Sequence, residues 1–235
     1  MSSLDLALIV FELFVMVIAI SLHDCAQAWM ANRLGDPTAR MLGRVTMNPA
    51  QHFDVWGMGI SPLLSIFVFH NPLPFGWGKQ VPTTYRNFRS KNGEVLSVVA
   101  GPAAQMLAAV VALIALVILK HTVHGAPQSL GLAVLVSQRI PLTGIGDQMG
   151  GIFPVLLLLY MALVMNLLLF VFNLLPLPVL DGGKILVRYL PYNAAKAFEQ
   201  YSMYFVLAFF FIGGPLIAIG FGPLMAIFNA LLAAL

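Results

Sequence analysis

The chain has 235 residues, of which 60% are apolar and only 9% are charged. Soluble domains usually carry about 25% charged residues, so this composition excludes an ordinary soluble protein, and the net charge of +3 does not indicate a nucleic-acid-binding protein. Apolar runs of about 18 residues or more recur along the chain, which is typical of an integral membrane protein with several spans. The single cysteine, Cys25, excludes an intrachain disulfide framework.

The first span is expected at about residues 6–30. No Lys or Arg precedes its apolar run, so we interpret it as a retained helix rather than a cleaved signal peptide. Glu12 lies well inside this stretch, where an ionisable group is costly unless it faces protein or water. At roughly 1.5 Å per residue along a helix, Glu12 is too far from His23 for the two to share a metal. We therefore expect Glu12 to be a buried, hydrogen-bonded acid.

The rest of the chain alternates polar connections with apolar segments. We expect a short strand at about 39–47, and a Pro-, Gly- and aromatic-rich loop or edge strand at about 74–82. The apolar stretches that follow the first span are expected at 55–69 (too short for a clear span), 94–120, 152–175 and 204–235 (one broken span or two short ones), with a mixed, exposed segment at 121–151. The sequence thus predicts an all-α integral membrane protein: one domain over 1–235, a polytopic helical bundle of about four to six spans, with short edge strands on the cytoplasmic side.

The Lys and Arg residues indicate how the spans are oriented. Three lie in 33–44, four in 79–91 and three in 184–196, with only two elsewhere. If the 55–69 stretch does not cross, all three basic segments lie on one side, which the positive-inside rule makes cytoplasmic. His23, near the end of the first span, and Asp181, just after the 152–175 span, would then reach the same membrane depth. The alternative for Asp181 is a helix cap or a turn, as Asp-Gly-Gly often forms.

The stretch from Ser21 to Trp29 contains an altered form of a zinc-protease motif. In H-E-x-x-H, a helix places two His ligands on one face and the Glu acts as general base on metal-bound water. Here the first His is His23, the acid is Asp24 and the second His position holds Gln27. With Asp181 from a distant segment, these residues are candidates for an intramembrane metal site.

The chain resembles the site-2 proteases, a family of intramembrane zinc metallopeptidases, over roughly residues 8–190. Besides His23 to Trp29, the matching pieces occur in one order: RLGDPT at 33–38, LGRVTMNP at 42–49, HFD at 52–54, PFGWGK at 74–79, AGPA at 100–103 and NLLPLPVLDGG at 173–183. The resemblance implies zinc as the cofactor and cleavage of a partner's transmembrane helix close to the cytoplasmic face of a bacterial-type inner or plasma membrane. It also implies that strands at 39–47 and 74–82 clamp the substrate by strand addition.

The resemblance also assigns roles to residues. His23, Gln27 and Asp181 take the three metal-ligand positions, Asp24 takes the position of the catalytic Glu, and Gln105 falls near a position where the family places an Asn that helps to hold the substrate. Gln is a poorer zinc ligand than His, and Asp is one methylene shorter than Glu, a displacement of about 1 Å that can cost on the order of 100-fold in rate. His52 is a possible additional ligand if its loop folds back over the site.

Three hypotheses follow. The first is an altered zinc protease with His23, Asp181 and either Gln27 or His52 as ligands and Asp24 as base. The second is a pseudoprotease that binds transmembrane client proteins without cutting them, and the chemistry of the two replacements favours it. The third is a transporter whose intramembrane polar residues line a path, which the family resemblance disfavours. The expected partners are a transmembrane protein and membrane lipid, with no nucleic acid; the oligomeric state is left open.

Overall fold

The protein is built from helices and the loops that connect them. Its computed structural model describes residues 3–68, 73–140 and 150–235. Four helices in that part of the chain contain segments long and apolar enough to cross a membrane: α1 (Ser3–Arg33), α5 (Gly93–Thr122), α7 (Phe153–Leu174) and α10 (Ser202–Ala234). The predicted polytopic helical membrane protein is therefore confirmed, with the number of such helices at the lower end of the expected range.

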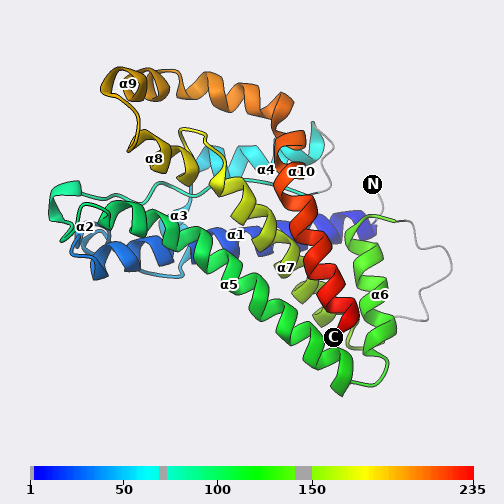
Figure 1. Cartoon of the computed structure of the whole chain (residues 1–235). Helices are drawn as coiled ribbons and strands as arrows, with labels where there is room; N and C mark the ends of the chain where they lie inside the picture. Colours follow the sequence, from blue (N-terminus) through cyan, green and yellow to red (C-terminus); the bar gives the residue numbers. More distant parts are fainter. Residues whose placement is uncertain (1–2, 69–72, 141–149) are drawn as a thin grey trace.

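Helix α7 forms the centre of the bundle. It packs against α1, α5, α10 and the shorter α6 (Ala126–Ser137), and its buried residues include Tyr160 and Phe172 (Figure 1). Of its most apolar window, 72% is buried inside the protein, compared with 17% for α10. Because buried apolar surface holds a helix in place, α7 is a core helix, whereas α10 leaves most of its apolar surface available to lipid or to another protein.

The last apolar block forms one helix with a bend. Pro215 and Pro223 lie inside α10, and Figure 1 shows this helix changing direction along its length. Proline removes a backbone donor and clashes with the preceding turn, which bends a helix without necessarily ending it. Of the two predicted alternatives, the single interrupted span is therefore the one observed.

The short apolar stretch that follows the first loop packs along the segment at residues 73–75. It consists of a π-helical segment, η1 (Val55–Ile60), followed by α4 (Ser61–Phe67). The Ser61 hydroxyl donates to the carbonyl of Phe75 at 3.1 Å, and the Ser65 hydroxyl donates to that of Leu73 at 3.3 Å. The returning chain thus runs antiparallel to α4, and these two segments do not cross the bundle.

The prediction of a strand at 39–47 is wrong. Thr38–Met41 forms a short helix, α2, and the backbone N–H of Arg44 donates back to the carbonyl of Ala39 at 2.9 Å. The backbone N–H groups of residues 41–44 all donate within this turn rather than to a neighbouring strand. The sequence Asp36-Pro37 favours the helical turn, because the Asp36 carboxylate accepts from the Thr38 backbone N–H at 3.1 Å.

The prediction of an edge strand at 74–82 is also wrong, because these residues form no strand. Its carbonyls are bonded to side chains instead: those of Lys79 and Gln80 accept from the Arg44 guanidinium at 2.5 and 3.3 Å. Pro74 and Pro82 have no N–H to donate to a neighbouring strand. The expectation of cytoplasmic edge strands, and of strand addition to them, is therefore withdrawn.

The three basic segments lie together at one end of the bundle. The Asp36 carboxylate accepts from Thr84 N at 2.6 Å and from Asn87 Nδ2 at 3.0 Å, which joins the loop after α1 to the segment before α5. Arg188, directly after α8 (Asp181–Val187), donates to Tyr85 Oη at 2.6 Å and so joins the third basic segment. The arrangement agrees with the predicted placement of these segments on one side of the membrane.

Glu12 lies far from this end and is paired, as expected for a buried acid. Its Oε2 accepts from Arg139 Nη2 at 2.8 Å, and its side chain is 1% exposed. Arg139 follows α6 in the segment that was expected to be mixed and exposed. The pair ties that segment to α1 and takes no part in the site described next.

Candidate functional site

The three predicted ligand positions meet in the protein. His23 Nε2 and Asp181 Oδ2 are 2.9 Å apart, and Gln27 Nε2 lies 3.0 Å from His23 Nε2 and 2.6 Å from Asp181 Oδ2. All three side chains are buried. His23 and Gln27 are one turn apart on α1, and Asp181 is the first residue of α8. The expected approach of Asp181 to His23 is confirmed, while the metal-ligand roles of these residues remain a prediction.

The amide of Gln27 presents its nitrogen, not its oxygen, to the other two positions. Gln27 Nε2 also donates to the Val98 carbonyl on α5, at 3.1 Å. Because both Val98 O and the Asp181 carboxylate are acceptors, the hydrogen-bond network fixes this orientation of the amide. A metal ligand would have to present the amide oxygen instead, and that oxygen would then face the carboxylate in place of a donor.

Asp181 is held as a carboxylate by its neighbours. Its other oxygen, Oδ1, accepts from Lys184 Nζ at 3.0 Å, one turn further along α8. Burial acts to raise the pKa of Asp181, but His23, Lys184 and Gln27 outweigh it and hold the pKa below its ordinary value. Each oxygen of Asp181 is thus already engaged by a side-chain donor.

Asp24, the expected general base, faces a different set of residues. Its Oδ2 lies 3.4 Å from His52 Nδ1 and 3.6 Å from Arg44 Nη2. His52 ends the short helix α3 (Pro49–His52), and its Nε2 donates to the Thr46 carbonyl at 2.8 Å. The loop after α1 does fold back against α1, as a role for His52 as an additional ligand would require. His52 nevertheless contacts Asp24 rather than the ligand positions.

Two glycines allow the chain to come close to these side chains. A Cβ added at Gly101 on α5 would lie 2.5 Å from Cε1 of His23, and one added at Gly78 would lie 2.2 Å from Oδ2 of Asp24. Larger residues at either position would displace the site side chain. The quoted pieces PFGWGK and AGPA thus each contribute a glycine whose backbone packs against the site.

Gln105 reaches the site only through another residue. It is fully buried on α5, and its Oε1 accepts from Asn173 Nδ2 on α7 at 3.3 Å, while its own Nε2 has no hydrogen-bond partner among the described residues. Asn173 lines a small cavity with His23 and Asp181. The catalytic role predicted for Gln105 is not tested by this arrangement.

The small cavity is lined by both His23 and Asp24. Its volume is about 20 Å³, and its walls also include Gly78, Asn173, Asp181 and Lys184. A site of this size holds about one water molecule, and these walls offer the polar partners that a buried water needs. The cavity has no room for a peptide segment.

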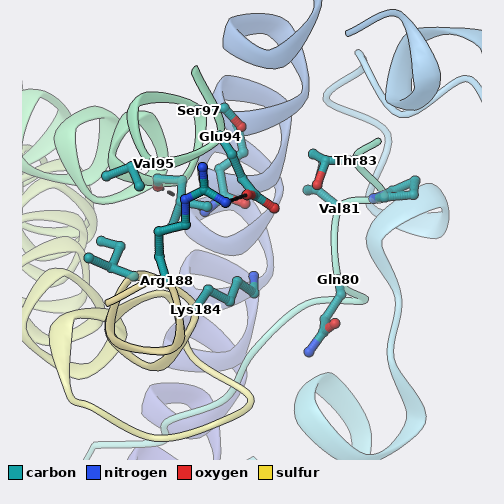
Figure 2. Close-up of a pocket in the computed structure, with 12 residues that line it drawn as sticks. Gln80, Val81, Thr83, Glu94, Val95, Ser97, Lys184 and Arg188 are labelled. Carbon is teal, nitrogen blue, oxygen red and sulfur yellow. Dashed lines mark hydrogen bonds and ion pairs between the residues drawn. The ribbon is translucent and has the colours of Figure 1, made fainter. Parts of the chain in front are cut away.

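Two larger spaces border the cluster. One is a pocket of about 420 Å³, with Gln27 and Val98 in its wall. Figure 2 shows Lys184 and Arg188 on one side of this pocket, with Gln80, Val81 and Thr83 across from them. The other is an apolar groove of about 510 Å³ between η1, α4 and the first part of α10, with Trp56, Met203 and Leu207 among its walls. Gln80 lines both of these spaces and the small cavity as well.

The donor set does not fit a catalytic zinc ion. Zinc is held by His, Cys and carboxylate ligands, and catalytic sites use three of them. In the described part of the chain, no group of three or more His, Cys, Asp or Glu side chains could hold a metal ion. His23 and Asp181 provide two ligands, the third position turns an amide N–H toward them, and His52 lies with Asp24. No step of a reaction is therefore derived through zinc.

Arg44, Asn173 and Lys184 belong to the site but were not predicted from the sequence. The spacing of Lys184, three residues after Asp181, could have indicated a pair once a helix was assumed to begin at Asp181. Asn173 stands at the start of the quoted NLLPLPVLDGG piece, which marks the segment without identifying the side chain. Arg44 gives no local signal, because its contact with Asp24 depends on how the loop folds.

Comparison with known proteins agrees with this architecture. The model of peptidase family M50 matches residues 11–213. The chain is 29% identical over 205 residues to the protein named "Putative zinc metalloprotease YwhC" from Bacillus subtilis (strain 168), covering 87% of this chain and 80% of that protein. No solved structure matches the chain. With four helices apolar enough to cross a membrane and a family match over most of its length, the chain belongs to peptidase family M50, the site-2 protease family of membrane proteins.

Proposed function

We propose that this protein binds transmembrane helices of other proteins, at the cytoplasmic side of the membrane, without hydrolysing them. The observation that carries the proposal is the Gln27 amide, whose nitrogen, and not its oxygen, faces both other ligand positions. A catalytic zinc ion needs three good ligands and an activated water, and this chain provides two ligands and a base position occupied by Asp24. The family model matches residues 11–213, while two residues at the centre of the site differ from the usual His and Glu.

The apolar groove is where a client helix would lie. It opens between α4 and α10, and α10 buries little of its own apolar surface. A large exposed apolar surface on a membrane protein is available to lipid or to another transmembrane helix. The polar pocket beyond Gln80 would accept the polar residues that follow the client helix, and its Lys184, Arg188 and Glu94 provide charges of both signs.

The test combines metal content, cleavage and crosslinking. The full chain is reconstituted in vesicles with a model transmembrane peptide, and a photo-crosslinking residue replaces Leu207 in the groove or, as a control, Ile227, an exposed residue on α10 that does not line it. We expect crosslinks from position 207 in excess of those from position 227, an intact peptide, and far less than one zinc ion per chain. Equal crosslinking from the two positions would contradict helix binding in the groove.

An altered zinc protease is the second candidate, because the small cavity beside His23 and Asp24 has room for one water. That function requires about one zinc ion per chain, lost on His23→Ala, together with cleavage of the peptide. Either result in the wild-type protein would overturn the proposal of a non-hydrolytic role. We further expect that Gln27→His raises zinc content, because it restores an imidazole at the third ligand position.

A further inference from the structure

The Gln27 amide joins three separate helices at one atom. Its nitrogen lies 2.6 Å from Asp181 Oδ2 on α8, 3.0 Å from His23 Nε2 on α1 and 3.1 Å from Val98 O on α5. The Gln27 side chain is buried, so these contacts form away from water. Hydrogen bonds between groups that cannot turn to water instead hold their elements in one arrangement.

The protons in this cluster can be assigned from the contacts. His23 Nε2 and Asp181 Oδ2 are within hydrogen-bonding distance of each other, and the carboxylate can only accept, so the proton between them belongs to His23 Nε2. The two N–H groups of the Gln27 amide then donate to Asp181 Oδ2 and Val98 O. These three N–H groups each have an acceptor, while His23 Nδ1 has no hydrogen-bond partner among the described residues. The lone pair that His23 Nε2 would give to a metal is covered by a proton.

We propose that the Gln27 amide takes over the structural role of the metal ion, holding α1, α5 and α8 together in a core that needs no metal. A metal ion draws electron-donating atoms from different helices toward one point. A carboxamide NH₂ group at that point does the same for oxygen acceptors, with hydrogen bonds in place of coordination bonds. A metal-free cross-link thus takes the place of the family's metal centre. Gln27, the residue that prevents good zinc binding, also compensates for the loss of the zinc ion.

The inference predicts how stability responds to a chelator. Purified full-length protein is unfolded thermally and by denaturant, with and without a strong chelator, and folded protein is followed by its retention on size-exclusion chromatography. The wild-type protein should show no change with the chelator. Gln27→Leu, which keeps the bulk but removes both N–H groups, should lower the equilibrium constant for folding by about tenfold or more, because a hydrogen bond to the Asp181 charge is lost.

Two further variants keep the result interpretable. Gln27→His should be destabilised in the chelator and should recover when zinc is added, whereas Gln27→Leu should not recover. Gln105→Leu is the matched control, because Gln105 is equally buried on a neighbouring helix but has a single hydrogen bond, to Asn173. Its effect should be smaller than that of Gln27→Leu. If Gln27→Leu does not fold at all, the chelator response of the wild-type protein and the zinc response of Gln27→His still decide the question.

Three outcomes would overturn the inference: a chelator that destabilises the wild-type protein, a Gln27→Leu variant as stable as the wild type, or equal effects of Gln27→Leu and Gln105→Leu. The inference concerns how the core is held, so it can fail while helix crosslinking at position 207 succeeds. Conversely, failure of helix crosslinking would leave the stability measurements unchanged.

Discussion

His23 and Gln27 face one set of neighbours on α1, and Asp24 faces another. The first two lie against α5 and α8, where Val98 and Asp181 complete a dense set of hydrogen bonds. Asp24 points toward Arg44 and His52 in the loop that follows α1, with longer contacts of 3.4 and 3.6 Å. Adjacent residues on a helix project in different directions, so one motif serves two structures. One altered position joins three helices, whereas the other joins a helix to a loop.

The comparison indicates that the two altered positions, Asp24 and Gln27, belong to separate clusters. In the cluster around Gln27, the amide donates to Asp181 and to Val98, whereas Nδ1 of His23 has no hydrogen-bond partner among the described residues. Asp24 Oδ2 has ion-pair neighbours but no hydrogen-bond partner among the described residues, and Asp24 lines the small cavity together with His23 and Asp181. Restoring only one of the two positions should therefore not restore the family's chemistry.

The largest effect is expected from Asp181→Ala. This change leaves the His23, Gln27 and Lys184 donors without their common acceptor, and removal of one partner from a buried ion pair costs about 3–5 kcal/mol. The free energy of unfolding, measured by denaturant titration in detergent, should fall by that amount. Lys184→Met is the matched control: it removes only the outer, partly exposed member of the cluster and should cost about 1 kcal/mol or less.

A smaller effect is expected from Asp24→Ala. Arg44 would lose its buried counter-charge but keep its bonds to the carbonyls of Lys79 and Gln80, so we expect a loss of about 1–3 kcal/mol. Limited proteolysis should also show faster cleavage in the loop after α1. An effect of Asp24→Ala as large as that of Asp181→Ala would break the distinction between the two clusters.

Double variants test the same distinction without relying on absolute stability. Residues in one network show interaction energies of about 0.5–3 kcal/mol. We expect Asp24→Ala to be coupled to Arg44→Leu more strongly than to Gln27→Leu, even though Asp24 is closer to Gln27 along the chain. Stronger coupling to Gln27 would mean that the motif acts as one unit after all.

The sequence was informative where the physics is local or averaged over many residues. Apolar runs located α1, α5 and α7 within a few residues, and the Lys and Arg counts predicted that the basic segments gather at one end. The same reasoning predicted that Asp181 and His23 reach the same membrane depth. In a small helical bundle, two residues at the same depth on neighbouring helices are expected to lie close together. The motif letters then identified Gln27 and Asp24 as the informative departures.

The sequence was less informative where contacts depend on how loops fold. A short strand was predicted at 39–47, but the backbone bond from Arg44 to Ala39 closes a turn instead. His52 was predicted to be a possible additional ligand. It lies beside Asp24 instead, because α3 places it next to that residue. The orientation of the Gln27 amide could not have been predicted at all, since it depends on a carbonyl of α5, 71 residues away.

The smallest effect is expected at Asp36, the second anchor of the loop that Asp24 holds. Its carboxylate accepts from Thr38, Thr84 and Asn87. Burial acts to raise the pKa of Asp36, but these hydrogen bonds outweigh it and hold the pKa below its ordinary value. A carboxylate whose pKa is lower in the folded state stabilises the fold at neutral pH, and this contribution is lost as the pH falls below about 4.

Asp36→Asn should therefore cost about 1 kcal/mol at pH 7, and the difference from the wild type should shrink as the pH is lowered toward 3. Asn87→Ala removes one donor to the same carboxylate and should give a smaller loss with the same pH dependence. A difference that stays constant from pH 7 to pH 3 would show that the charge of Asp36 does not matter. The loop would then depend on Asp24 alone, and the effect of Asp24→Ala on proteolysis should be correspondingly larger.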